Sequence, residues 1–394
     1  MQDTGCVMSS RERMPGNERL CILLVNRKVL PSIGGIQICT NLLATGLLQE
    51  GAVVKVLATV TPPPSEQPNV SYPVVYRPGL KEAWRCVKES SVVHFNAFSW
   101  RVWLYAKLLR KPILFVYHDA GDRLCARSLH WRFWLRRCGF HPQGSCNWCE
   151  KIMFFRSPRH WFIKPLQQRL IDRMDGVVSP GKWILSRLPG HAKSIANGID
   201  LDKYHPTENP TRDYLLFVGR LVVVKGPDLL IRAVAKCRSR GKTIRLVLVG
   251  DGPLRMECES LVRKLGISDQ VVFKGEVARE NTLQYYQNAA AVVIPSVLKE
   301  DMFPTVALEA MACRTPVIAS AFGGLKETVG QAGLVYPPGD VSALADRILT
   351  LSGDADLAAE LSGQGYRLVR ERYQESRMVH NYLMLYQGLQ GQRT

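Results

Sequence analysis

The sequence predicts an α/β protein of two domains, each a parallel sheet covered by helices. Its 394 residues are enough for two domains that each bury their own core. Short runs rich in β-branched residues alternate with stretches of good helix formers along most of the chain. A Pro-containing polar stretch at residues 206–212 separates two such arrays, which places the boundary near residue 205.

These arrays divide the chain into four parts. Residues 1–18 are polar and mixed in charge, so we expect a disordered tail without the apolar core of a signal peptide. Residues 19–205 form the first domain, 206–375 the second, and 376–394 a helix that crosses back to the first. Because no apolar run approaches the roughly 18 residues that span a bilayer, we expect a cytoplasmic protein.

Basic and aromatic residues are concentrated in the first domain. Residues 1–190 carry 27 Lys and Arg against 12 Asp and Glu, and they contain all eight Trp of the chain. An anionic membrane surface, single-stranded nucleic acid, and a solvated basic face over an aromatic core all fit this composition. The most basic part is an insertion at about residues 120–173. We expect it to face either the inner surface of a membrane or the molecule that accepts a group transferred by this protein.

Four cysteines of the same insertion are close enough in sequence to suggest a metal site. Two of them form a Cys-x2-Cys knuckle, and four thiolates can bind zinc tetrahedrally. The remaining spacing is not a standard zinc pattern, so plain reduced cysteines are the alternative. Any zinc would be structural, since a closed four-thiolate site leaves no open position. The four residues are Cys125, Cys138, Cys146 and Cys149.

The first array begins with a strand at residues 20–25, a loop that contains Gly34 and Gly35, and a helix over 37–49. Glycines between a strand and a helix let the backbone approach a phosphate closely. Further strands are predicted at 92–95 and 113–118. His118 ends the latter at a carboxyl edge, where open α/β sheets bind their ligands. Asp119, which follows His118 directly, and Asn96, which follows the strand at 92–95, are weaker candidates.

The second array places two cations directly after its first strand, residues 214–218. Gly219 and Arg220 follow the strand, and Lys225 comes five residues later. The guanidinium offers a fork of donors and the ammonium a point charge, which together can hold a diphosphate. A solvated basic turn is the alternative.

A further strand–loop–helix–strand unit at residues 290–320 carries two carboxylates. Asp301 lies on the loop and Glu309 on the helix, eight residues apart. The helix N-terminus, at Phe303, Pro304 and Thr305, offers free backbone N–H groups that can bind an anion. A carboxylate beside such a site suits a nucleotide sugar, whereas the plainer interpretation is an acidic loop before an amphipathic helix. The last helix is predicted at 371–388.

The Asp301-x7-Glu309 spacing, followed by Ala-Met-Ala-Cys and Thr-Pro-Val-Ile, resembles the Glu-x7-Glu signature of family-4 retaining glycosyltransferases. The resemblance covers about residues 20–388 and is most specific over 214–340. Asp301 stands where that family more often has Glu, with Glu300 as the alternative acid, and Met-Phe-Pro-Thr replaces the commoner Gly-Phe-Gly. The resemblance implies the GT-B architecture, two Rossmann-like domains facing a cleft.

It also implies sugar transfer with retention, without a metal or another cofactor, from a nucleotide-sugar donor to a glycan or lipid-linked acceptor. The donor would be a UDP- or GDP-sugar, and the pathway cell-surface polysaccharide or glycolipid synthesis. Arg220 and Lys225 would stabilise the leaving diphosphate, Asp301 the sugar and Glu309 the ribose hydroxyls. His118 would orient the sugar near its reacting carbon. Further donor contacts would come from Gly34, Gly35, Gly219, Val277, Phe303, Pro304 and Thr305.

Two other functions remain open at this point. A sugar-nucleotide epimerase of related architecture would need acid and base carboxylates in the first domain, where acids are few. A nucleic-acid-binding protein would explain the net charge of +18. It would not explain Arg220, Lys225 and the Asp301–Glu309 pair, so we expect no nucleic acid partner.

Overall fold

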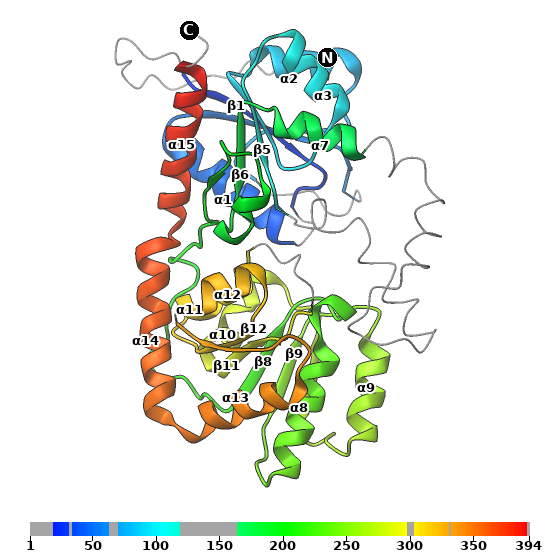
Figure 1. Cartoon of the computed structure of the whole chain (residues 1–394), viewed down its shortest axis with the longest axis vertical. Helices are drawn as coiled ribbons and strands as arrows, with labels where there is room; N and C mark the ends of the chain where they lie inside the picture. The colour runs from blue at the N-terminus through cyan, green and yellow to red at the C-terminus, as the bar shows by residue number, and fades with distance from the viewer. Residues whose placement is uncertain are drawn as a thin grey trace.

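The computed structural model describes residues 19–30, 34–62, 70–118, 164–297, 303–330 and 332–391. It contains two parallel sheets, one above the other in Figure 1. The predicted α/β class and the pair of Rossmann-like arrays are confirmed. Several predicted positions lie outside the described residues: the N-terminal tail, Asp119, most of the basic insertion with its four cysteines, Glu300 and Asp301.

The first sheet has seven strands in the order β3-β2-β1-β4-β5-β6-β7. Their bounds are β1 Cys21–Asn26, β2 Val53–Ala58, β3 Val74–Tyr76, β4 Val92–Phe95, β5 Ile113–Val116, β6 Gly176–Ser179 and β7 Lys193–Ser194. The helices of this part are α1 Gly35–Gln49, α2 Leu80–Glu89, α3 Trp100–Leu108, α7 Lys164–Asp172 and the 3-10 helix η2 Lys182–Arg187.

Both faces of this sheet are buried, as the continuous apolar runs of its strands require. On β1, Ile22 and Leu24 pack into the core beneath α1, while Leu23 and Val25 pack into the core beneath α2, α3 and α7. The side chains alternate because successive residues of a strand point to opposite faces. The carboxyl ends of the strands therefore form the edge on which polar groups can gather.

The second sheet has six strands in the order β10-β9-β8-β11-β12-β13. Their bounds are β8 Tyr214–Val218, β9 Leu246–Val249, β10 Val271–Gly275, β11 Ala289–Ile294, β12 Val317–Ser320 and β13 Leu334–Tyr336. Around it lie η3 Val223–Lys225, α8 Pro227–Ser239, α9 Arg255–Lys264, η4 Arg279–Asn281, α10 Leu283–Asn288, α11 Thr305–Ala312, α12 Gly323–Val329, α13 Val341–Gly353 and α14 Ala355–Arg372.

Capping side chains set where α13 and α14 begin. The side chain of Asp340 accepts a hydrogen bond from the Ala343 N–H at the start of α13, and Asp354 does the same for Leu357 at the start of α14. Each carboxylate thereby satisfies one of the N–H groups that a helix start leaves without an intrahelical acceptor.

The chain crosses back to the first domain at residues 373–374. The single helix predicted over 371–388 is wrong at its start, because α14 ends at Arg372 and α15 spans Glu375–Gly391. The break occurs where Gln374 bridges to Ile199, with the Glu375 N–H bonded to the Ile199 carbonyl at 3.1 Å. These bonds replace helical ones. Residues Met378, Tyr382 and Tyr386 of α15 then join the core beneath α1.

Close approach of α15 to its neighbours depends on two glycines. A methyl group on Gly46 of α1 would lie 2.4 Å from Cγ2 of Val379, and one on Gly198 would lie 2.5 Å from Cα of Glu375. Neither distance is compatible with a real side chain. Figure 1 shows the consequence, with α14 and α15 running along one side of both sheets.

Candidate active site

The donor-side candidates lie on loops at the carboxyl edge of the second sheet. Gly219 and Arg220 follow β8 directly, Arg220 is exposed, and Lys225 ends the short helix η3. Gly226, the next residue, has φ +64°, and a Cβ there would lie 2.3 Å from the Pro295 carbonyl. Only glycine fits this position. It lets the loop carrying Lys225 lie directly against the loop that follows β11.

The start of α11 lies at the same edge. Pro304 is its N-cap and Thr305 its first residue. The first N–H groups of a helix have no intrahelical acceptor and carry the positive end of the helix dipole, so this end can bind an anion. Val277 follows β10 and is half-buried, and Phe303 packs its ring against Tyr373 at 5.5 Å. The loop between Val297 and Phe303, which contains Asp301, lies outside the described residues.

Glu309 is the most buried charged side chain of this edge, at 5% exposure. Tyr286 donates a hydrogen bond to its Oε2 at 2.5 Å, and Nη2 of Arg279 lies 3.6 Å from its Oε1. Arg279 also lies over the ring of Tyr204, 5.7 Å from its centroid. The carboxylate is therefore held by a cation and a hydroxyl, as a buried charge requires.

Arg279 and Tyr286 were not predicted as site residues. The sequence signal that could have found them is their position, since Arg279 follows β10 and Tyr286 precedes β11. Nothing in the spacing links either to Glu309, because both pairings join residues that are far apart in the chain. The sequence indicated Glu309 as a candidate carboxylate but not the groups that hold it.

The first domain gathers a chain of neutral polar groups at its own carboxyl edge. The Nε2 of His118 lies 2.7 Å from Oδ1 of Asn96, and the same oxygen lies 3.0 Å from Nε2 of His94. The Nδ1 of His94 lies 2.6 Å from the hydroxyl of Tyr386 on α15. The predicted residue His118 is thus joined to the C-terminal helix through two intermediates.

Asn96 is held in one orientation by a second set of bonds. Its Nδ2 donates to Oδ1 of Asn26 at 3.0 Å and to Oγ1 of Thr40 at 3.2 Å, and the Thr40 hydroxyl donates to the Ile36 carbonyl at 2.8 Å. Oδ1 of Asn96 is therefore the hydrogen-bond acceptor that faces the two histidines. An amide oxygen cannot donate, so both histidines must carry their proton on Nε2. Tyr386 then donates to Nδ1 of His94, and Nδ1 of His118 keeps its lone pair.

Both imidazoles are neutral at physiological pH. Burial lowers the pKa of His118 to about 4, and burial together with His118 lowers the pKa of His94 to about 3. A low dielectric disfavours the charged form, which agrees with the donor and acceptor assignments. Asn26, Thr40, His94 and Tyr386 were not predicted, and Asn96, a weak candidate for the acceptor side, is the centre of this network.

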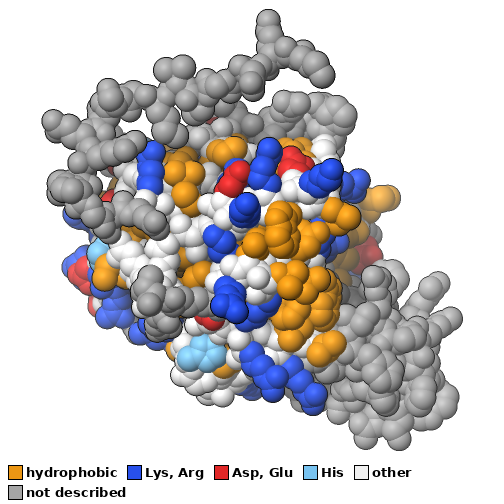
Figure 2. Space-filling view, turned by 90° about the horizontal axis from the view of Figure 1, so that it is seen from above, with side chains coloured by type: hydrophobic (Ala, Val, Ile, Leu, Met, Phe, Trp, Pro, Cys, Tyr) orange, Lys and Arg blue, Asp and Glu red, His pale blue; other side chains and the backbone are white. Residues whose placement is uncertain are grey.

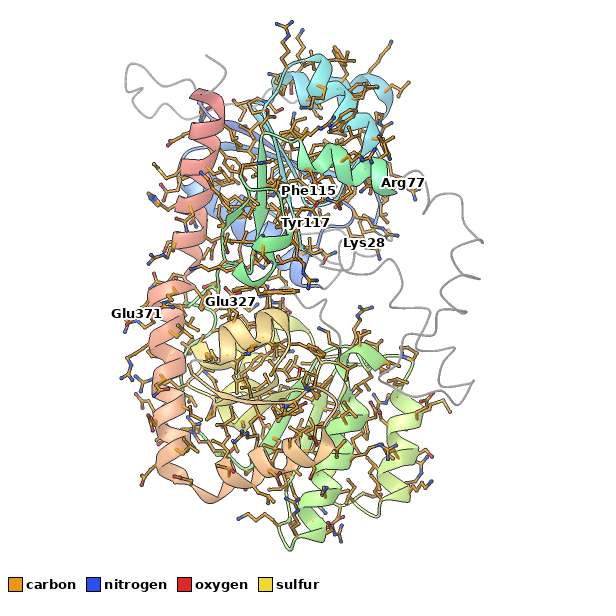
Figure 3. All side chains as sticks on the ribbon, in the orientation of Figure 1. Lys28, Arg77, Phe115, Tyr117, Glu327 and Glu371 are labelled. Atoms are coloured by element: carbon orange, nitrogen blue, oxygen red, sulfur yellow. The ribbon has the colours of Figure 1, made fainter. Side chains whose placement is uncertain are left out.

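Contacts between the two domains bring these edges together. Glu327 of α12 accepts hydrogen bonds from the backbone N–H groups of Lys182 and Trp183 at the start of η2, both at 3.1 Å, and Figure 3 shows it between the two domains. A methyl group on Gly35 would lie 4.0 Å from Cγ2 of Thr305. The first turns of α1 and α11 therefore lie next to each other.

Electrostatics support the same proximity. Burial raises the pKa of the Cys39 thiol of α1 to about 12, and the charges of Arg279 and Glu309 also act on it. The glycines predicted to face a donor, Gly34 and Gly35, thus begin a helix within electrostatic reach of the Glu309 pair. The structure places this part of the first domain against the donor-side candidates of the second.

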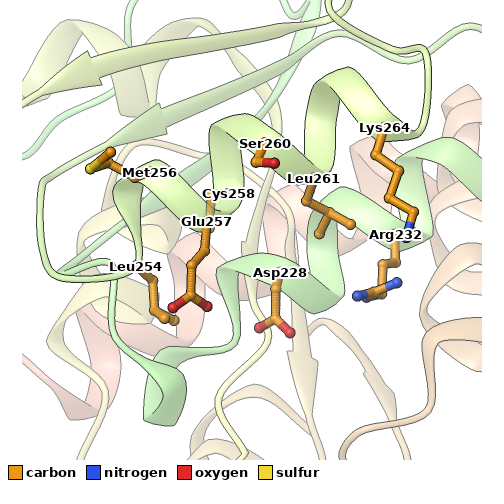
Figure 4. Close-up of a pocket in the computed structure, with 9 residues that line it drawn as sticks. All are labelled: Asp228, Arg232, Leu254, Met256, Glu257, Cys258, Ser260, Leu261 and Lys264. Atoms are coloured by element: carbon orange, nitrogen blue, oxygen red, sulfur yellow. The ribbon is translucent and has the colours of Figure 1, made fainter.

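A hollow of about 490 Å³ lies between α8 and α9 (Figure 4). Its walls include Asp228, Arg232, Glu257 and Lys264, and none of its lining residues is a predicted site residue. Among the residues that the structure describes, no group of three or more His, Cys, Asp or Glu could hold a metal ion. The proposed four-cysteine zinc site lies outside those residues and stays a prediction.

Residues 200–368 match the family described as glycosyl transferases group 1. The D-inositol 3-phosphate glycosyltransferase of Frankia alni is 38% identical over 188 residues, which are 45% of this chain and 44% of that protein. An uncharacterised glycosyltransferase of Methanocaldococcus jannaschii is 43% identical over 141 residues, which are 34% of this chain and 35% of that protein. The chain thus spans less than half the length of these two relatives.

Solved structures match over nearly the whole chain. Sucrose-phosphate synthase from Thermosynechococcus elongatus superposes with a TM-score of 0.68 at 24% identity, covering 94% of this chain and 99% of that one. HepE of Anabaena, solved with UDP and glucose, superposes with a TM-score of 0.73 at 19% identity, covering 94% and 100%. These neighbours are GT-B glycosyltransferases, so the predicted GT-B fold is confirmed.

Proposed function

We propose that this chain, a GT-B protein of the glycosyl transferases group 1, transfers a sugar from a nucleotide-diphosphate donor to a hydroxyl of a glycan or lipid-linked acceptor. The observation that carries the proposal is the combination at the second sheet edge. Arg220, Lys225 and the N-terminus of α11 supply positive charge, while the buried Glu309 supplies a carboxylate. HepE, of the same fold, is solved with UDP-glucose, which supports a nucleotide-sugar donor.

The chemistry follows from where charge must be stabilised. As the bond from the anomeric carbon to the diphosphate oxygen breaks, negative charge grows on the leaving group. Arg220, Lys225 and the first N–H groups of α11 would bind that charge. Glu309, held by Arg279 and Tyr286, would accept hydrogen bonds from the ribose hydroxyls. Asp301 is assigned to the sugar hydroxyls.

His118 would act on the sugar as a neutral acceptor. Its Nε2–H is committed to Asn96, so the lone pair on Nδ1 can accept a hydrogen bond from a sugar hydroxyl. A neutral imidazole does not repel the positive charge that develops at the anomeric carbon. We propose that the acceptor hydroxyl attacks from the face that the diphosphate leaves, and that its proton passes to a departing phosphate oxygen. The configuration is then retained and no metal is needed.

The acceptor side is assigned to the first domain, whose excess of Lys and Arg suits anionic acceptors or lipid headgroups. We therefore propose a role in polysaccharide or glycolipid synthesis at the inner surface of a membrane. No described helix of this protein is both long and apolar enough to cross one.

A melting-point panel with UDP, GDP and ADP tests the donor site. A nucleotide that binds only the folded chain stabilises it by RT ln(1 + [L]/Kd), about 2.7 kcal/mol at a hundredfold excess over Kd. One nucleotide should raise the melting point of the wild type, and Lys225→Ala and Glu309→Gln should lose most of that shift. Lys242→Ala, an exposed lysine just after α8, is the matched control and should keep it.

Product analysis then tests the reaction itself. Incubation with the matching nucleotide sugar and acceptors should release nucleotide diphosphate at an EDTA-insensitive rate, with a product of retained anomeric configuration by NMR. Interconversion of free nucleotide sugars without an acceptor would instead indicate an epimerase. Absence of any nucleotide shift together with salt-dependent RNA retention would contradict the proposal.

A further inference from the structure

Large hydrophobic side chains are exposed mainly on one part of the first domain. Eight such side chains are exposed among the described residues, and five of them lie on α2 and α3. They are Leu80, Trp84, Trp100, Leu104 and Leu108, with exposed fractions between 37% and 66%. We call these five residues the α2–α3 face. Single exposed leucines are ordinary, but a contiguous set of this kind marks an interaction surface.

Helical spacing shows that the face is organised. Trp100, Leu104 and Leu108 are four residues apart and form one stripe along α3, while Val102 and Ala106 of the same helix are fully buried. On α2, Leu80 and Trp84 have the same spacing, with Ala83, Cys86 and Val87 buried behind them. Both helices therefore bury one side in the core and present a second apolar side outward.

One ring contact joins the two helices, and two others hold Trp100. The ring of Trp84 meets that of Tyr105 edge to face, with centroids 5.2 Å apart. The ring of Trp100 meets those of Phe98 and Trp103 in the same way, at 5.1 and 6.2 Å. Aromatic pairs of this geometry are mutually stabilising, so the tryptophans are held in place before any partner arrives.

Cations surround these apolar side chains. Residues 77–111 contain eight Lys and Arg against two acids, and one of those acids, Glu89, is paired with Lys55 at 2.9 Å and with Arg85 at 3.9 Å. Figure 2, which views the end of the molecule where α2 and α3 lie, shows apolar side chains bordered by Lys and Arg. The eight cations are Arg77, Lys81, Arg85, Lys88, Arg101, Lys107, Arg110 and Lys111.

We propose that the α2–α3 face docks the enzyme on the surface of an anionic lipid bilayer. Leucines would enter the boundary of the acyl chains, the tryptophan rings would lie at headgroup level, and the cations would meet lipid phosphates. Nucleic acid fits this face less well, because three of its five apolar residues are leucines, which have no ring for a base to stack on. The inference rests on the proposed function in that it gives a lipid-linked acceptor a route to the site.

Vesicle sedimentation with the full chain tests this surface. Vesicles of phosphatidylcholine mixed with phosphatidylglycerol should bind the wild type, less strongly as salt rises, and pure phosphatidylcholine should bind it far less. Lys81→Gln with Arg85→Gln should weaken binding about 25-fold, since each cation near the surface is worth about a factor of five. Leu104→Ser with Leu108→Ser should weaken it roughly tenfold or more.

Matched controls change the same residue types elsewhere. Met256→Ser with Met384→Ser removes exposed apolar side chains, and Lys242→Gln with Lys264→Gln removes exposed charges, in both cases away from α2 and α3. Both control variants should bind vesicles like the wild type. All variants should keep the nucleotide-induced melting shift of the wild type, which reports that they are folded.

The outcomes separate this inference from the donor chemistry. Equal vesicle binding by the wild type and the α2–α3 variants, or no binding of the wild type, would overturn the docking surface while leaving the nucleotide shift in place. Loss of RNA binding in these variants, with vesicle binding unchanged, would assign the face to nucleic acid and also overturn it. A wild type that binds vesicles through this face but no nucleotide would instead contradict the proposed function.

Discussion

The two sheet edges of this protein hold their polar groups in opposite ways. At the second edge the groups are charged: Arg220 and Lys225 lie on loops, and Glu309 is buried against Arg279. At the first edge they are neutral, in a hydrogen-bonded chain that runs from His118 to Tyr386. A diphosphate needs compensating charge, whereas sugar hydroxyls need only well-oriented donors and acceptors. The difference matches the roles proposed for the two domains.

The charged edge should be the more sensitive to loss of one partner. Arg279→Ala leaves the buried carboxylate of Glu309 without its cation, and breaking a buried pair in this way costs about 3 kcal/mol. Urea unfolding should show the loss, and nucleotide binding should weaken with it. Arg245→Ala is the control, because its pair with Asp213 at 2.7 Å is exposed on both sides and contributes less than about 1 kcal/mol. Equal losses in the two variants would show that Arg279 does not hold a buried charge.

Loss of one partner at the neutral first edge should cost less stability than at the charged edge. Its effect should be confined to the surroundings of His94. Tyr386→Phe removes the hydroxyl that donates to Nδ1 of the buried His94, at a cost of about 1–2 kcal/mol. Nitrogen-15 NMR should find both His94 and His118 as Nε2–H tautomers in the wild type. In the variant His94 should stay an Nε2–H tautomer, because Asn96 still accepts from Nε2, while the Nδ1 resonance should shift with the loss of its donor and the melting shift with nucleotide should persist. A wild-type His118 protonated on Nδ1 would contradict the network.

Where the chain crosses between the domains, at Glu375, the effect of a substitution on stability should depend on pH. Burial, followed by the charges of Asp200 and Asp202, raises the pKa of Glu375 from 4.5 to about 7. The folded state then binds this proton more tightly than the unfolded state, so its contribution is fully present below about pH 4.5 and is lost as pH rises through 7. Glu375→Gln should therefore be more stable than the wild type above pH 7, and this advantage should shrink towards pH 5. A difference in melting point between the two proteins that stays constant from pH 5 to above pH 7 would show that the Glu375 carboxyl titrates normally.

Part of the site was predictable because its residues are contiguous. The strand, the Gly219–Arg220 pair and Lys225 occupy twelve consecutive positions, and a loop after a strand necessarily lies at the carboxyl edge of a parallel sheet. The contacts of the neutral network were not predictable, although His118 and Asn96 were candidates. Asn26, Thr40, Asn96 and Tyr386 come from distant segments, and they meet only because β1, β4 and β5 are neighbours in the sheet and α15 returns to its face.

The sequence by itself determined the α/β class and the position of Gly219, Arg220 and Lys225 after a strand, because alternation of apolar runs and positions of Gly, Pro and charge are local patterns. The tertiary structure alone decided three features. These are the pairing of Glu309 with Arg279, the proton position on His118, and the outward direction of the stripe on α3. Each depends on which segments become neighbours in space, and a hydrogen bond or a buried face exists only once the second partner is in place.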